Sequence, residues 1–275
     1  MRSRPDFRAA PFLWGAAGCA AAFVVVYVVF VRSYVGQVID ERAFDGANSW
    51  SGSVEIAHDL LDILPAAAVV VASVLAIILV AVRRNWRVLI VALAAAALAL
   101  ISNQMLKYSI LDRPDTGVTD GLSNSFPSGH TSLAATAALV VFLLAGPRLR
   151  PVAAVLGSLF AVAAGASTLV EQWHRTSDVI ASLLLVAFWG CLAGAVLVWM
   201  RMSGAQHPVT TRLWPITWIA AACALIAAGA LVATYTSAQA GTSHLFVAYV
   251  GGVAAIVAVG LALAVLANRL FRALG

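Results

Sequence analysis

The sequence predicts an all-α protein, a polytopic membrane bundle of about eight transmembrane helices. Hydrophobic residues make up 62% of the chain and charged residues only 11%, whereas about a quarter of a typical soluble domain is charged. The apolar residues also fall into runs of about 20, the length that crosses the hydrocarbon core of a bilayer. No polar stretch between these runs is long enough to bury a core of its own. These observations exclude an ordinary soluble protein.

Eight apolar runs are expected to form the spans. They are Pro11–Val31, Leu60–Val82, Val88–Leu106, His130–Ala145, Val152–Val170, Val179–Met200, Leu213–Tyr235 and Leu245–Ala267. The first run is too long for the apolar region of a signal peptide, so we expect a retained helix. A polar, amphipathic segment separates the first two runs. We assign residues 1–200 to a six-helix core and residues 201–275 to two additional helices.

The basic residues predict the orientation of the bundle. If the N-terminus is cytoplasmic, 12 of the 17 basic residues fall on the cytoplasmic side. These are Arg2, Arg4, Arg8, Arg83, Arg84, Arg87, Arg148, Arg150, Arg201, Arg212, Arg269 and Arg272. By the positive-inside rule both termini are then cytoplasmic. The net charge of +5 therefore reports membrane topology, and we expect no nucleic-acid partner.

The three cysteines, Cys19, Cys191 and Cys223, all lie inside apolar runs without the spacing of metal ligands. We interpret them as small hydrophobic residues. No cluster of carboxylates with the spacing of a divalent-ion site accompanies the histidines described below. We therefore expect neither a metal nor another cofactor.

The segment Pro127-Ser128-Gly129-His130, at the start of the fourth span, carries the first sign of chemistry. A Pro-Ser-Gly turn that opens a helix leaves backbone N–H groups without intrahelical partners at the positive end of the helix dipole. Such a helix start binds anions. A histidine at its edge can exchange a proton with the bound anion.

Two further segments on the same expected side of the membrane complement this helix start. Lys107 and Arg113 follow the third span, and His174 lies between the fifth and sixth spans with Asp178 four residues later. Two cations and a helix N-terminus suit a multiply charged phosphate. Asp178, one helical turn from His174, can hold one ring nitrogen and leave the other free to attack.

These segments resemble the motifs of the type 2 phosphatidic acid phosphatase superfamily, lipid phosphate phosphatases whose six-helix core is shared with vanadium haloperoxidases. The family has a Lys to Arg-Pro motif, a Pro-Ser-Gly-His motif and a Ser-Arg motif that ends in His-x-x-x-Asp. All three occur here in the family's order between Lys107 and Asp178. Pro-Ser-Gly-His alone is a weak signal, but the ordered set is a strong one.

The resemblance implies a role for each matching residue. His174 would be the nucleophile that forms a phosphohistidine, and Asp178 would orient it. His130 would protonate the leaving group and then activate water. The phosphoryl oxygens would be held by Lys107, Arg113, Ser128 and the backbone of Gly129.

The sequence departs from the family pattern at two places. Five residues separate Lys107 from Arg113, one fewer than in the family, which on an α-helix turns a side chain by about 100°. The arginine expected six residues before His174 is Thr168, so one bidentate phosphate contact is missing. Two groups are candidates to replace that contact, the adjacent Arg175 and the hydroxyl of Thr168 itself.

Simpler interpretations exist for the cations. Lys107, Arg113 and Arg175 can also act as interfacial anchors whose side chains extend to lipid headgroups. The ordered motifs favour a functional role for Lys107 and Arg113, and leave Arg175 evenly balanced.

The sequence thus predicts a multi-pass membrane phosphatase, expected in the plasma membrane, that acts on a lipid phosphate at the extracytoplasmic face. Phosphatidic acid, phosphatidylglycerol phosphate and polyprenyl diphosphate all fit such a site. Two other function classes stay open. One is a lipid phosphotransferase of the same fold, and the other is a catalytically silent lipid-phosphate binder or transporter, which Thr168 favours.

Overall fold

The computed structural model describes residues 9–47, 70–79, 81–82, 84–118, 124–200, 213–242 and 244–272. Throughout these residues the regular secondary structure is helical. Six of the described helices are long and apolar enough to cross a membrane. The chain is therefore an all-α, multi-pass membrane protein, which confirms the predicted fold class.

The helices follow the apolar runs closely. Their bounds are α1 Ala10–Val26 with a π-helical turn η1 Tyr27–Val31, α2 Tyr34–Ala47, α4 Trp86–Met105 with a π-helical turn η3 Leu106–Ile110, α5 Gly129–Leu144, α6 Arg150–Val170, α7 Thr176–Trp199, α8 Trp214–Gln239 and α9 Leu245–Phe271. The first part of the expected span Leu60–Val82, residues 60–69, lies outside the described residues, and the described part includes a helix over Val70–Leu79. At 16 residues, α5 is about 24 Å long and is shorter than each of the six candidate spans.

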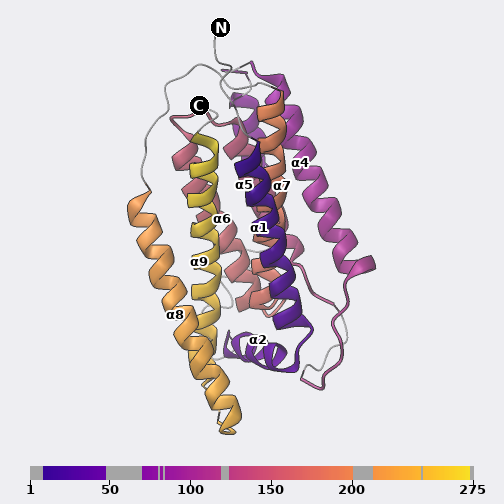
Figure 1. Cartoon of the computed structure of the whole chain (residues 1–275), viewed down its shortest axis with the longest axis vertical. Helices are drawn as coiled ribbons and strands as arrows, with labels where there is room; N and C mark the ends of the chain where they lie inside the picture. Colours follow the sequence, from indigo (N-terminus) through magenta and orange to yellow (C-terminus); the bar gives the residue numbers. More distant parts are fainter. Residues whose placement is uncertain are drawn as a thin grey trace.

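The long helices run side by side along the molecule, and α2 lies across one end of them (Figure 1). At this α2 end α4 and α6 finish and α5 and α7 begin, while α1 begins and α9 finishes at the opposite end. All three sequence motifs therefore fall at the α2 end. The helix α2 is the polar segment expected between the first two spans, and its buried side includes Gln37 and Asp40.

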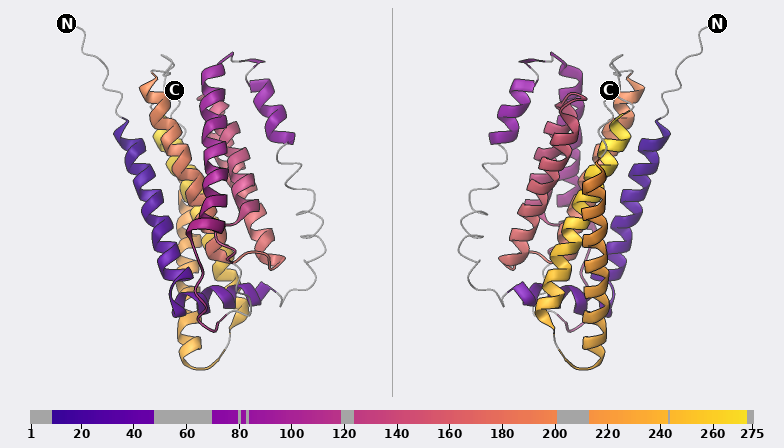
Figure 2. Two further views of the ribbon diagram at one scale, coloured as in Figure 1. Left: turned by 90° about the vertical axis from the view of Figure 1, so that its right-hand side faces the viewer. Right: turned by 90° about the vertical axis from the view of Figure 1, so that its left-hand side faces the viewer.

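The two C-terminal helices differ in their surroundings. α9 packs against α2, α6 and α7 as well as α8, whereas only 11% of the apolar window of α8 is buried. Figure 2 shows α8 lying along α9 on the outside of the bundle. In this arrangement α9 is part of the bundle and α8 presents its outer face to lipid.

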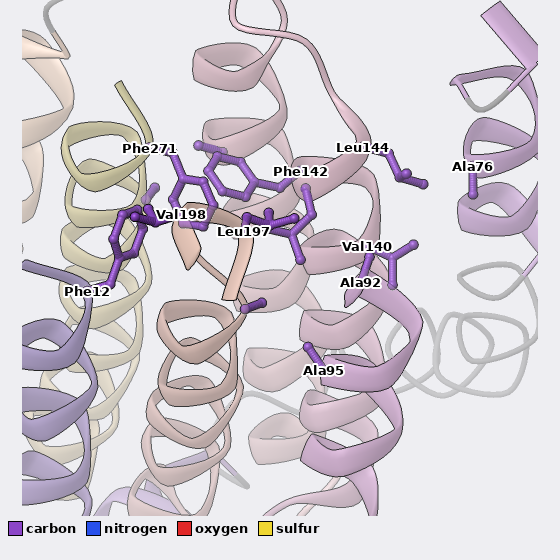
Figure 3. Packing of buried hydrophobic residues seen from close by; sticks show 14 residues of the cluster. Phe12, Ala76, Ala92, Ala95, Val140, Phe142, Leu144, Leu197, Val198 and Phe271 are labelled. Atoms are coloured by element: carbon purple, nitrogen blue, oxygen red, sulfur yellow. The ribbon is translucent and has the colours of Figure 1, made fainter. Parts of the chain in front are cut away.

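A phenylalanine cluster holds the helices together at the end away from α2 (Figure 3). The ring of Phe271 lies edge-on to the rings of Phe12 and Phe142, with centroids 5.0 Å apart in both pairs. Phe12 can approach α7 this closely because Gly194 has no side chain. A Cβ atom at Gly194 would lie 2.2 Å from Cε1 of Phe12.

We predict that Gly194→Ala destabilises the bundle, because Phe12 and Phe271 must move to admit the methyl group. Such overpacking typically costs about 1–3 kcal/mol. Thermal unfolding of the purified protein in detergent measures the change. Gly18→Ala is the matched control, since its Cβ would meet no atom within 4 Å. Equal melting temperatures for the two variants would contradict the prediction.

Candidate active site

The N-terminus of α5 is fixed by the serine of the Pro-Ser-Gly-His segment. Ser128 is fully buried, and its Oγ accepts hydrogen bonds from the backbone N–H of Thr131 (3.3 Å) and the hydroxyl of Thr131 (3.0 Å). The Ser128 hydroxyl therefore caps the helix. Of the predicted phosphate ligands in this segment, Gly129 is the better placed, because a Cβ on it would meet no atom within 4 Å. The open space beside Gly129 gives a ligand access to the backbone N–H groups of the first turn.

The second histidine follows the end of α6 in a tight turn. Gln172 has a φ of 55°, and the backbone N–H groups of Trp173 and His174 both donate to the carbonyl of Thr168. This turn brings the ring of His174 to 6.3 Å from the ring of His130, centroid to centroid. The two histidines predicted to act together therefore face one another, although 44 positions separate them in the sequence.

Asp178 lies on the first turn of α7 and is completely buried. Its Oδ1 accepts a hydrogen bond from Nη2 of Arg113 at 3.1 Å. Its Oδ2 accepts from Oγ of Ser125 at 2.6 Å and from the backbone N–H of Arg175 at 3.0 Å. Nδ1 of His174 is 3.4 Å from the same Oδ2. That distance is long for a hydrogen bond but close enough for the carboxylate to act on the charge of the ring.

The two predicted cations differ in their placement. The side chain of Arg113 is buried and paired with Asp178, while its Nε and Nη1 have no partner among the described residues. Lys107 lies in the π-helical turn η3, with Nζ 5.6 Å from the ring centroid of Tyr108. The π turn and the extended chain after it set the direction of Lys107, so the α-helical rotation expected from the shorter spacing does not apply.

The structure places the two candidates for the missing arginine differently. The Thr168 hydroxyl donates to the carbonyl of Gly165 inside α6, at 2.7 Å. Arg175 lies in the site wall: its Nε pairs with Glu41 at 2.5 Å, and its Nη1 donates to Ser125 at 3.3 Å. The guanidinium also lies over the ring of Phe44, 5.1 Å from its centroid. Arg175 thus joins α2 to the site.

The site now combines two facing histidines, a buried carboxylate, a buried arginine with free donors and a helix N-terminus. Among the described residues no group of three or more His, Cys, Asp or Glu side chains gathers as metal ligands do. The arrangement suits the binding of a phosphate group and its transfer to a histidine.

Comparison with known proteins agrees with this geometry. Residues 88–202 match the model of the PAP2 superfamily. This segment belongs to that superfamily. No curated protein and no solved structure matches the chain. The PAP2 segment runs from the start of α4 to the end of α7 and contains every site residue predicted from the sequence. The chain is therefore a membrane protein in which residues 88–202 match a phosphatase superfamily.

Two site contacts come from α2, which lies outside the PAP2 segment and was not predicted to take part. Asp40 is 2% exposed and accepts hydrogen bonds from the backbone N–H and the hydroxyl of Ser177. Glu41 pairs with Arg175. Two adjacent acidic residues stand out in an otherwise apolar sequence, but the sequence does not indicate which residues they contact.

Three further residues brace the PAP2 core without a motif of their own. Nδ2 of Asn103 donates to Oγ of Ser132 at 2.7 Å and to the carbonyl of Ser128 at 3.3 Å. The Ser182 hydroxyl donates to the same carbonyl at 2.8 Å. Ser125 bridges Asp178 and Arg175. These contacts fix α4 and α7 to the start of α5 and thereby hold the histidines in place.

The environment of Asp40 makes the stability of the protein depend on pH. Burial, and then the neighbouring charge of Asp178, raises the pKa of Asp40 to about 6. Between about pH 4 and pH 6 the folded protein then binds this proton more tightly than the unfolded chain. The contribution of Asp40 to the free energy of unfolding therefore falls as the pH rises through that window.

Asp40→Asn cannot ionise, and it keeps an oxygen that can accept from the Ser177 backbone. Relative to the wild type, we predict that it gains stability between about pH 4 and pH 7, by at most about 3 kcal/mol. Melting temperatures of both proteins in detergent across this range provide the test. Parallel pH profiles for the two proteins would refute the prediction.

Proposed function

We propose that this protein is a metal-independent membrane phosphatase that removes a terminal phosphate from a lipid through a phosphohistidine intermediate. The observation that carries the proposal is the meeting of His174, His130 and Arg113 at the N-terminus of α5. Each comes from a different motif segment of the PAP2 core. The rings of His130 and His174 lie 6.3 Å apart, and Arg113 is paired with Asp178, the carboxylate beside His174. A lipid phosphate is the substrate class that fits a polar site at the end of a membrane bundle.

The first chemical step is attack by Nε2 of His174 on phosphorus. The bond between phosphorus and the leaving oxygen breaks, and His130 donates the proton that the leaving alcohol or phosphate needs. Asp178, 3.4 Å from Nδ1, stabilises the positive charge that develops on the ring of His174. In the second step His130 takes a proton from water, which attacks the phosphohistidine. The P–N bond breaks and inorganic phosphate leaves.

Arg113 is the main electrostatic partner of the phosphate in this proposal. Its Nη2 is held by Asp178, which orients the guanidinium, and its unpartnered Nε and Nη1 can donate to two phosphoryl oxygens. Lys107 adds a second positive charge. The arginine replaced by Thr168 would have contributed roughly 1.5–3 kcal/mol as a charge-assisted donor. Arg175, positioned by Glu41 and Ser125, is our candidate to supply part of that contribution.

The distribution of charge supports an extracytoplasmic site in a protein that we assign to the plasma membrane. The site lies at the α2 end, opposite the start of α1 and the end of α9. In the topology predicted from the sequence, 12 of the 17 basic residues fall on the side of those two chain ends. By the positive-inside rule the α2 end then faces away from the cytoplasm. The phosphate of an outer-leaflet lipid can enter at headgroup depth while its hydrocarbon chain stays in the bilayer.

The test is phosphate release by the purified protein in detergent containing EDTA. Phosphatidic acid, phosphatidylglycerol phosphate and polyprenyl diphosphate form the substrate panel. We predict release from at least one of them, lowered by at least about three orders of magnitude in His174→Ala, because the nucleophile is removed. His244→Ala, at the exposed start of α9, is the matched control and should retain activity.

Three outcomes would overturn the proposal. Activity that EDTA abolishes would contradict metal independence, and activity that survives in His174→Ala would contradict the nucleophile. A folded protein that binds these lipids but releases no phosphate would be a silent binder, or a phosphotransferase if radiolabelled phosphate appears on an added lipid alcohol.

A further inference from the structure

A cavity of about 170 Å³ lies beside the site, between α2, α7 and the C-terminal helices α8 and α9. Its walls are mostly small apolar side chains, including Ala227 and Leu231 on α8 and Ala255 on α9. The residues of α8 that line it, 227 to 234, span about 10 Å along the helix. A cavity of this size and lining accommodates a stretch of hydrocarbon.

The cavity opens where the protein faces lipid. Leu231 at its edge is 42% exposed, and α8 is the least buried of the six candidate spans. The sequence of α8 contains no charged residue. Inside a membrane the medium around this opening is hydrocarbon, so the chain of a lipid is the occupant at hand.

Two residues of the cavity wall carry buried hydroxyl groups, which favour an occupant with a hydrogen-bond acceptor over a plain hydrocarbon chain. Oγ1 of Thr176 and Oγ1 of Thr234 have no hydrogen-bond partner among the described residues, and the two residues are only 8% and 1% exposed. Buried hydroxyls are nearly always paired. An ester carbonyl near the head of a lipid chain is a group that can accept from them.

A positive charge lies at the same end of the cavity. Nη1 of Arg42 donates to the carbonyl of Thr234 (3.4 Å), to Oγ of Ser237 (3.0 Å) and to the carbonyl of Thr242 (3.1 Å). These contacts hold the guanidinium of α2 beside the end of α8. A phosphodiester headgroup above the ester region would find a complementary charge there.

The cavity and the active site occupy opposite sides of α7. Thr176 and Ile180, four residues apart, share the face that lines the cavity, whereas Asp178 lies about 200° around the helix from Thr176. A lipid in the cavity is therefore not the molecule whose phosphate meets His174. Asp40, hydrogen-bonded to Ser177, also lines the cavity.

We propose that this cavity is an accessory lipid site that binds one hydrocarbon chain of a phosphodiester phospholipid, with its ester group at Thr176 and Thr234. The site gives the C-terminal helices a function, since α8 and α9 supply most of its wall. The bound chain packs against the first turn of α7, the turn that carries Asp178. The inference does not depend on the chemistry proposed for the histidines.

The test uses the full-length protein in phosphatidylcholine vesicles with a small fraction of phosphatidylcholine that carries a diazirine in the middle of one acyl chain. This lipid has no phosphomonoester, so its labelling does not report hydrolysis. After irradiation, mass spectrometry of peptides should find label concentrated on the cavity-lining parts of α7, α8 and α9. His174→Ala should be labelled to the same extent.

Matched variants decide whether the label reports the cavity. Ala227→Phe fills it, and we expect labelling of α7 and α9 to fall at least fivefold, while Ala222→Phe on the exposed side of α8 leaves it unchanged. Thr234→Val removes an unpartnered hydroxyl at nearly constant volume and should lower labelling severalfold. Thr236→Val, on the exposed surface, is its control. Uniform labelling of all lipid-facing helices, or labelling that Ala227→Phe and Thr234→Val leave unchanged, would overturn the proposal.

Discussion

The buried carboxylate of Asp178 is the interaction on which the rest of the site depends. It receives Arg113 from the segment after α4, Ser125 from the segment before α5 and the backbone of Arg175 at the start of α7. It also lies beside His174. All three motif segments are therefore held to one side chain that has no access to solvent. Breaking a buried ion pair of this kind leaves an uncompensated charge, which is strongly unfavourable. The same contacts that stabilise the carboxylate thus fix the geometry of the histidines.

A second layer of contacts, from α2, surrounds this centre. Asp40 accepts hydrogen bonds from the hydroxyl and the backbone N–H of Ser177, and Glu41 forms an ion pair with Arg175. Nε2 of Gln37 donates to the carbonyl of Pro114, directly after Arg113. Helix α2 thereby contacts the start of α7, which carries Asp178, and also the segment that carries Arg113. Charged groups that are buried in a membrane protein need such partners. Helix α2 supplies them from outside the PAP2 segment.

The fold and the centre of the site were predictable from the sequence for different reasons. Long apolar runs have few alternatives in a membrane, so the helices follow them within a few residues. His130, His174, Asp178 and Arg113 lie in ordered motifs, and the structure brings them together. The role of α2 was not predictable, because Asp40 and Glu41 are distinguished only by partners more than 130 positions away. The capping role of Ser128 and the bond from Thr168 to its own helix depend on local backbone geometry, which spacing alone does not determine.

Trapping the phosphorylated enzyme tests the proposed role of His174. Phosphatidic acid or polyprenyl diphosphate radiolabelled in its terminal phosphate would be mixed with His130→Ala, in which hydrolysis of the intermediate lacks its base. We expect a protein-bound phosphate that is labile to acid and stable to alkali, located on His174 and absent from the double variant that also carries His174→Ala. Because His130 also protonates the leaving group, wild-type protein quenched during turnover is analysed beside the variant. Label on another residue, or turnover with no phosphohistidine found in either protein, would contradict the phosphohistidine mechanism.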